Sequence, residues 1–190
     1  MLKDFGIAAR MLILMTVLTG LVYPLTMTGV AQVLFPRQAN GSVIADGETK
    51  VGSELLGQSF EKPENFWSRP SATSPVPYNG TAGSGSNLAT TNPQLVEVVK
   101  GRIAKLKEAD PDNQLAVPVD LVTSSASGLD PHISPAAAKY QVSRVAKARG
   151  MTREEVETIV KDHTEPPTLG IFGQPRVNVL KLNQALAARK

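Results

Sequence analysis

A long uncharged segment lies close to the N-terminus and limits the folds open to this chain. Between Arg10 and Arg37 the sequence reads MLILMTVLTGLVYPLTMTGVAQVLFP, without one Asp, Glu, Lys or Arg. A helix needs about 20 mostly apolar residues to cross the ~30 Å hydrocarbon core of a bilayer, and this segment is long enough. We therefore expect a short tail at residues 1–10, a transmembrane helix at residues 11–35 and a folded domain at residues 36–190.

A cleaved signal peptide is the alternative interpretation of this segment. Lys3 and Arg10 would form its basic start, and Gly29-Val30-Ala31 resembles a cleavage site made of small residues. However, the apolar core of a signal peptide has only about 7–15 residues. The length of the segment therefore favours a retained membrane anchor.

The charges beside the segment indicate how it is oriented. Lys3, Arg10 and the free N-terminal amine lie on one flank, whereas Arg37 and the more distant Lys50 lie on the other. Basic residues are more frequent on the cytoplasmic side of membrane proteins. The pattern predicts a cytoplasmic N-terminus and a folded domain on the far side of the membrane.

Small residues within the segment offer a surface for a second helix. Thr16 and Gly20 lie one helical turn apart, a spacing that lets another membrane helix approach closely. The alternative is that Gly and Pro are simply common in such helices. We also expect Pro24 to bend the helix, because its ring displaces the carbonyl group four residues earlier.

The composition of the chain excludes several classes of function. It is 42% hydrophobic and 19% charged, which is typical of a folded protein and not of a disordered one. A net charge of +3 without a long basic run does not indicate nucleic-acid binding. The absence of Cys rules out disulfides, thiolate metal sites and Cys nucleophiles, and two His residues leave little for a zinc centre.

The first half of the folded region is rich in turn-forming residues. Asn40-Gly41 and Asp46-Gly47 separate short apolar stretches, which predicts a β-hairpin within residues 40–60. Residues 63–92 are rich in Pro, Gly, Ser and Thr, as a flexible linker would be. Because this stretch also contains the only Trp, Trp67, we expect an ordered loop instead.

Signals for helix starts are clearer in the second half. They predict helices that begin after Asn92, Ser134 and Thr152, and a last helix through Leu182 and Leu186. The intervening residues 115–122, LAVPVDLV, predict a short edge strand interrupted by Pro118. Together these elements predict an α+β fold: a single transmembrane helix followed by one compact α+β domain.

Familiar catalytic motifs are missing from the sequence. There is no P-loop, GxGxxG, HExxH, GxSxG or aspartyl-phosphate DKTG motif. The glycine-rich segment at residues 81–87, TAGSGSN, has backbone amides that could surround an anion, but flexible loops of this composition are more common. We therefore expect no catalytic residues and no metal site.

One cluster of polar residues leaves a catalytic alternative open. Asp130 and His132 lie close to Ser127 and Ser134, the residue types of a membrane-anchored hydrolase. Asp130-Pro131 is equally typical of a turn, and Ser134 of a helix cap. The structural interpretation needs no third partner and is preferred, and His163 likewise fits a helix C-terminus.

Five segments, in this order behind an N-terminal apolar helix, resemble one protein family. They are GSELLGQSF (52–60), FWSRPSA (66–72), YNGTAGSGSNLATTNP (78–93), PVDLVTSSASGLDPHISPAAAKYQVSRVAKARG (118–150) and GQPRVNVLKLN (173–183). The chain is similar over nearly its whole length to the C subunit of the Kdp potassium-transporting ATPase. One difference is that the family commonly has Ser-Gly-Gly-Ser-Asn where this chain has residues 83–87, GSGSN.

The resemblance implies an accessory subunit of a bacterial inner-membrane complex that takes up potassium with high affinity. Its partners would be a channel-like potassium-binding subunit, a P-type ATPase subunit and a small single-span subunit, besides membrane lipid. For the family, this subunit is described as stabilising the complex and as a catalytic chaperone that raises the affinity of the ATPase subunit for ATP. The resemblance places a direct nucleotide contact at Gln141.

Two mechanisms follow from this resemblance. In the first, the domain binds ATP as a ligand shared with the ATPase subunit, through Ser127, Gly128 and Gln141. In the second, it is a periplasmic cap or gate over the potassium-binding subunit and makes no nucleotide contact. The residues expected to contact partner subunits are Thr16, Gly20, Arg69, Gly83 and Asn87.

Overall fold

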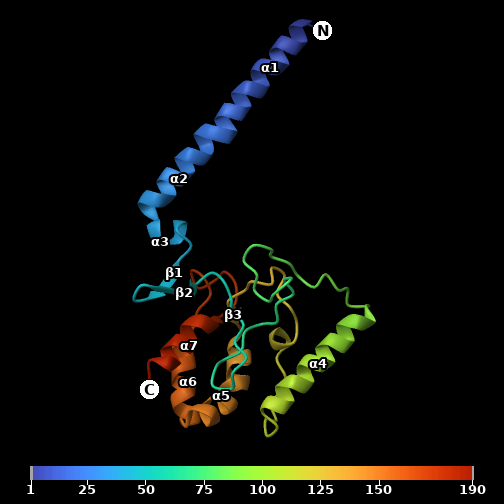
Figure 1. The fold of residues 1–190 in the computed structure, drawn as a ribbon, viewed down its shortest axis with the longest axis vertical. Helices are drawn as coiled ribbons and strands as arrows, with labels where there is room; N and C mark the ends of the chain where they lie inside the picture. Colours follow the sequence, from blue (N-terminus) through green and yellow to red (C-terminus); the bar gives the residue numbers. More distant parts are fainter. Residues whose placement is uncertain (1, 190) are drawn as a thin grey trace. The chain divides into compact units, whose positions relative to one another are not determined.

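The computed structural model describes residues 2–189, which form two compact units (Figure 1). The first unit ends at Ser53 and the second begins at Glu54. The sequence predicts one folded domain from residue 36 onward. In the structure, residues 36–53 group with the N-terminal helix, and the residues that follow form a core of their own.

An apolar helical segment makes up most of the first unit. It consists of α1 (Leu2–Val17), a π-helical turn (Leu18–Val22) and α2 (Tyr23–Leu34). The helix Lys3–Leu34 is long and apolar enough to cross a membrane, and none of its most apolar window is buried. At about 1.5 Å per residue, 32 residues extend over ~48 Å. The predicted N-terminal apolar helix is confirmed, and residues 2–10, expected to be a tail, belong to it.

The π-helical turn lies directly before Pro24. The backbone N–H of Tyr23 bonds to the carbonyl of Leu18, five residues earlier. Pro24 has no N–H to offer the carbonyl of Gly20, and its ring would clash with that carbonyl in a regular helix. A wider turn removes this clash, and it lies directly before Pro24, where the sequence predicts a bend.

A short helix and a β-hairpin complete the first unit. Helix α3 (Pro36–Ala39) precedes strands β1 (Val43–Asp46) and β2 (Thr49–Ser53), which pair antiparallel with a bulge between Ile44 and Ala45. The two-residue connection begins with Gly47 at φ 60°, a conformation that glycine adopts without strain. The hairpin predicted within residues 40–60 is confirmed.

The second unit combines four helices with a small sheet. Its elements are α4 (Pro93–Ala109), the 3₁₀ turn η2 (Val119–Leu121), β3 (His132–Ile133), α5 (Pro135–Arg149), α6 (Arg153–Asp162), β4 (Thr164–Glu165), β5 (Arg176–Asn178) and α7 (Val179–Ala187). The strands are antiparallel in the order β3-β5-β4. The α+β fold class is confirmed.

The predicted helix starts are confirmed by their capping bonds. The side chains of Asn92 and Ser134 accept hydrogen bonds from the amides of Gln94 (2.9 Å) and Ala137 (3.0 Å). Thr152 forms a capping box with Glu155. These local bonds satisfy amides that have no partner within the helix.

The strand predicted at residues 115–122 is wrong. The segment is irregular up to Pro118 and then forms the single 3₁₀ turn η2. Pro118 cannot donate to a strand pair, and Asp120 uses its carboxylate to bind the amide of Ser134 at 2.7 Å. A turn presents Asp120 to the start of α5, which a paired strand would not.

The core of the second unit lies between α5, α6, α7 and strand β5. Figure 1 shows these three helices gathered together, with α4 to one side of them. Among the residues of helix α4, only Leu106 is buried. Fully buried side chains include Phe66, Ile133, Val142, Val156 and Leu182. Phe66 is notable because it comes from the irregular loop and not from a helix or strand.

Two side-chain amides fix the backbone of that loop. Asn183 of α7 accepts from the N–H of Phe66 (2.8 Å) and donates to its carbonyl (3.0 Å). Gln141 of α5 binds Trp67 in the same way, at 2.7 and 3.1 Å. Both amides are nearly fully buried. We call this pair of residues the amide clamp.

Two arginines of α5 extend the hold on the loop. Arg144 donates to the carbonyls of Pro63 (2.5 Å) and Asn65 (3.1 Å), and its guanidinium lies 4.3 Å from the centre of the Trp67 ring. Burial lowers the pKa of Arg144 to about 10, so this cation stays protonated at neutral pH. Arg149 donates to the carbonyl of Glu64 at 2.6 Å. The prediction of an ordered loop is therefore confirmed.

Replacing Asn183 by Leu tests the amide clamp. The change keeps the branched shape of the side chain but leaves the N–H and carbonyl of Phe66 buried without partners, so we expect a loss of about 2–3 kcal/mol in unfolding free energy. Urea unfolding of the detergent-solubilised chain, followed by the emission of Trp67, measures it. The exposed Gln94→Leu is the matched control, and equal stability of the two variants would contradict the interpretation.

Candidate functional site

The structure brings the glycine-rich segment next to two of the predicted nucleotide-binding residues. The N–H of Ser84 donates to the carbonyl of Ser127 at 2.8 Å. A Cβ on Gly85 would lie 2.8 Å from the carbonyl oxygen of Ala126, and one on Gly128 would lie 2.5 Å from that of Ser84. Only glycine permits this backbone approach. Residues 83–87 thus pack against residues 125–129, and Gly83 and Asn87 lie exposed in the same region.

Gln141, the third predicted nucleotide-binding residue, has a different environment. Its side chain is 1% exposed and belongs to the amide clamp. Besides Trp67, its amide group bonds to the carbonyl of Ala137 (3.2 Å) and the guanidinium of Arg144 (2.7 Å). Its polar atoms are therefore all engaged inside the domain, whereas Ser127 lies exposed on a loop.

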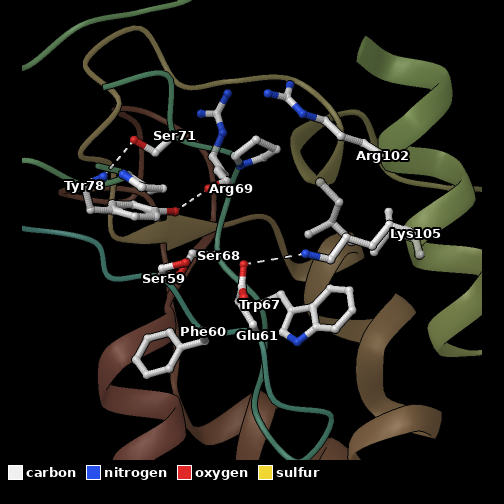
Figure 2. Close-up of a pocket in the computed structure, with 14 residues that line it drawn as sticks. Ser59, Phe60, Glu61, Trp67, Ser68, Arg69, Ser71, Tyr78, Arg102 and Lys105 are labelled. Carbon is white, nitrogen blue, oxygen red and sulfur yellow. Dashed lines mark hydrogen bonds and ion pairs between the residues drawn. The ribbon is translucent and has the colours of Figure 1, made fainter. Parts of the chain in front are cut away.

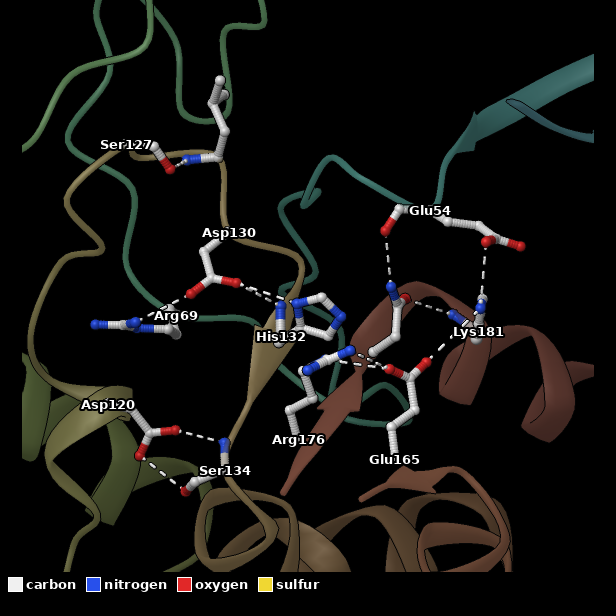
Figure 3. Close-up of polar contacts among 12 residues, drawn as sticks. Glu54, Arg69, Asp120, Ser127, Asp130, His132, Ser134, Glu165, Arg176 and Lys181 are labelled. Atoms are coloured by element: carbon white, nitrogen blue, oxygen red, sulfur yellow. Dashed lines mark hydrogen bonds and ion pairs between the residues drawn. The ribbon is translucent and has the colours of Figure 1, made fainter. Parts of the chain in front are cut away.

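Asp130 joins Arg69 to His132 in a polar cluster (Figure 3). One carboxylate oxygen lies 3.0 Å from Arg69 Nη1. The other accepts from the backbone N–H of His132 at 3.0 Å and lies 3.4 Å from its Nδ1. Burial alone would raise the pKa of Asp130, but the bonds from His132 and Arg69 outweigh it and hold the pKa below its ordinary value.

The serines near this cluster are engaged elsewhere. Ser127 Oγ accepts from the amide of Leu129 at 3.1 Å, and Ser134 Oγ donates to Asp120 at 3.1 Å. Among residues 2–189, no serine hydroxyl bonds to His132. The geometry supports turn formation by Asp130 and helix capping by Ser134, and it does not assemble the nucleophile and base of a hydrolase.

A second ionic cluster, which the sequence analysis missed, ties the sheet to α7. Glu165 of β4 lies 3.1 Å from Arg176 Nη2 and 3.8 Å from Lys181 Nζ. Lys181 also lies 3.3 Å from Glu54 at the start of the second unit (Figure 3). These ion pairs are partly exposed, and they fasten the edge of the sheet without offering a reactive group.

A cavity of about 270 Å³ lies between α4 and the loop of residues 59–78. Figure 2 shows Arg102 and Lys105 reaching from α4 towards this loop, which contributes Trp67 and Arg69. Tyr78 lines the cavity and donates its hydroxyl hydrogen bond to the carbonyl of Arg69. Burial raises the pKa of Tyr78 to about 12, so it remains a neutral donor. The sequence analysis did not identify Arg102 and Lys105 as site residues. The apolar periodicity of a helix shows which face packs inward, but it does not show which segment lies opposite the polar face.

The polar side chains of this region are engaged in hydrogen bonds and ion pairs within the domain. In the part of the chain that the structure describes, no three His, Cys, Asp or Glu side chains come together as a metal site would require. The predicted contact residues Thr16 and Gly20 lie exposed on the apolar helix, and Arg69 lies between the Asp130 cluster and the cavity.

Comparisons with known proteins match this chain along nearly its full length. The family model described as K+-transporting ATPase, c chain, matches residues 5–188. A potassium-transporting ATPase KdpC subunit of Herpetosiphon aurantiacus is 59% identical over 182 residues, covering 96% of this chain and 94% of the relative. One from Methylococcus capsulatus is 54% identical over 188 residues, which cover 99% of both chains.

The Asp130 cluster predicts how stability depends on pH. Because the folded state lowers the pKa of Asp130, its contribution is complete above the ordinary Asp pKa of about 3.9 and is lost as the pH falls through the lower folded value. We expect Asp130→Asn to lower the thermal midpoint at pH 7 and to have a smaller effect near pH 3. Thermal unfolding between pH 3 and 7 measures this, with exposed Asp112→Asn as control. An Asp130→Asn deficit that stays constant over this range would contradict it.

Proposed function

Because the chain belongs to the KdpC family, the c chain of the K+-transporting ATPase, we propose that it is a membrane-anchored, non-catalytic subunit that docks onto the other subunits of that complex. The observation that carries this proposal is the apolar helix Lys3–Leu34, of which no part of the most apolar window is buried by the rest of the chain. Such a surface needs lipid or partner helices around it.

The polar residues of the second unit support a docking role. The residues considered for catalysis or nucleotide binding make interactions within the domain. Asp130 forms ion pairs, Ser134 caps a helix and Gln141 belongs to the amide clamp. A rigid domain with exposed loops suits contact with protein partners. We propose that Arg69, Gly83 and Asn87 face a partner subunit, because all three lie on loops held in place by hydrogen bonds or close backbone packing.

We further propose that the second unit lies on the periplasmic side of a bacterial inner membrane, as a cap on the potassium-binding subunit. The basic flank formed by Lys3 and Arg10 supports this orientation. The ATP chaperone role implied by the family resemblance is proposed as an indirect effect, transmitted by contacts between subunits. The burial of Gln141 favours this route, since direct contact with ATP would break the amide clamp.

Replacing Gly20 by Leu tests docking within the membrane. A Cβ at Gly20 would meet only Thr16 Cγ2, at 4.0 Å, so the change leaves the chain itself undisturbed while blocking the close approach of another helix. We expect at least a several-fold loss of co-purified partner subunits and a higher KM for ATP in the ATPase that remains. Gly29→Leu, at a glycine elsewhere on the same helix whose added Cβ would meet nothing within 4 Å, is the matched control. Full assembly of the Gly20 variant would contradict this interface.

The orientation is tested by a cysteine at Ser84. The chain has no Cys, so Ser84→Cys is the only target for a thiol reagent on this subunit, and residue 84 is exposed. A membrane-impermeant maleimide should label it in cells with an intact inner membrane, whereas Lys3→Cys should react only after that membrane is opened. The reverse pattern would place the folded unit in the cytoplasm and remove the cap proposal.

A further inference from the structure

The cavity beside α4 has an unbalanced set of charges. Three cations line it, Arg69, Arg102 and Lys105, against a single carboxylate, Glu61 (Figure 2). Its remaining lining includes apolar side chains of Phe60, Pro70, Pro77, Leu106 and Leu121. Apolar walls reduce screening by water, so like charges repel more strongly here than on an open surface.

Arg102 is held by neutral partners alone. Its guanidinium donates to the carbonyl of Val122 (2.9 Å) and to Ser124 Oγ (3.1 Å). Within residues 2–189, no carboxylate lies at ion-pair distance from it. Partial burial lowers the pKa of Arg102, which reflects the loss of hydration, yet an arginine remains charged at neutral pH.

Arg69 has a donor to spare. Its Nη1 is used by Asp130, but its Nε is buried and has no hydrogen-bond partner in the part of the chain that the structure describes. Buried donors are rarely left unpaired in proteins, because an unpaired donor costs about 1–3 kcal/mol. Arg69 thus lines the same cavity as Arg102 and has one guanidinium N–H that the described part of the domain leaves unpaired.

Lys105 is only loosely engaged. Its ammonium lies 3.6 Å from Glu61 and 5.5 Å from the centre of the Trp67 ring. Both members of the ion pair are more than half exposed, so the pair is weak and can be displaced. Glu61 then acts as a competitor for any anion that enters.

From this geometry we propose that the cavity is an anion-binding site that takes a carboxylate or phosphate group between Arg69, Arg102 and Lys105. Guanidinium groups bind such groups through paired N–H bonds, and the ammonium adds a point charge. The group comes either from a free anion or from an acidic side chain of a partner subunit. The site is separate from Gln141, and the inference does not rest on nucleotide binding.

Trp67 makes the site directly measurable, because it is the only Trp and lines the cavity. Inorganic phosphate and acetate are titrated in turn into the full chain in detergent, at constant ionic strength, while Trp67 emission is recorded. We expect a saturable change with at least one of them. Arg102→Gln should weaken it about tenfold, Arg102→Lys less, and Glu61→Gln should tighten it two- to threefold by removing the competing carboxylate.

Lys100→Gln is the matched control, because Lys100 lies exposed on the same helix and pairs with Glu97 outside the cavity. It should bind within twofold of the unchanged chain. Glu61→Gln alters an exposed side chain and leaves folding intact, so it decides the matter even where Arg102→Gln is unstable. Saturable binding whose affinity is unchanged in both the Arg102 and the Glu61 variants would overturn the proposal.

A second arm distinguishes the source of the anion. Lys105→Cys is labelled with an impermeant maleimide in the free chain and in the assembled complex, and assembly of Arg102→Gln is compared with that of Lys100→Gln. Protection on assembly, together with an assembly defect of the Arg102 variant alone, assigns the group to a partner's acidic side chain. Free-anion binding without protection assigns it to a solute. Neither binding nor protection would overturn the site.

Discussion

The second unit depends on paired hydrogen bonds to backbone N–H and carbonyl groups. Such pairs usually join neighbouring strands, but here side chains make them. Asn183 and Gln141 each present a donor and an acceptor to one backbone residue, as a neighbouring strand would, and so hold Phe66 and Trp67 without a sheet. Because Phe66 is then fully buried, the loop becomes part of the core. Arg69 follows shortly after Trp67, lines the cavity and binds Asp130, so the position of Arg69 rests on these two amides.

Features determined by neighbouring residues were predictable from the sequence. The caps at Asn92, Ser134 and Thr152 need only the few residues after them, and the hairpin at Gly47 needs only its turn. The conformation of residues 115–122 was not predictable in this way. It depends on the hydrogen bond between Asp120 and Ser134, which an alternation of apolar residues does not encode. Long-range contacts decide such segments.

The candidate site shows the same limit. Asp130 and His132 are two residues apart, and their pairing could be anticipated, but the cavity draws Glu61, Arg69 and Arg102 from distant parts of the chain. Gln141 was marked only by the family resemblance, as a nucleotide contact. Its burial follows from the loop that covers it, and no local pattern reveals that loop's path. Residues that the sequence analysis considered for catalysis or nucleotide binding, such as Asp130, Ser134 and Gln141, instead form ion pairs and hydrogen bonds that hold the fold together.

The π-helical turn before Pro24 has a consequence for how the anchor meets its surroundings. One additional residue in a turn rotates everything beyond it by roughly 100° about the axis relative to an uninterrupted α-helix. Side chains before Leu18 and after Val22 that would otherwise share a stripe are turned away from one another. The residues before and after the turn therefore present different faces to whatever surrounds the helix.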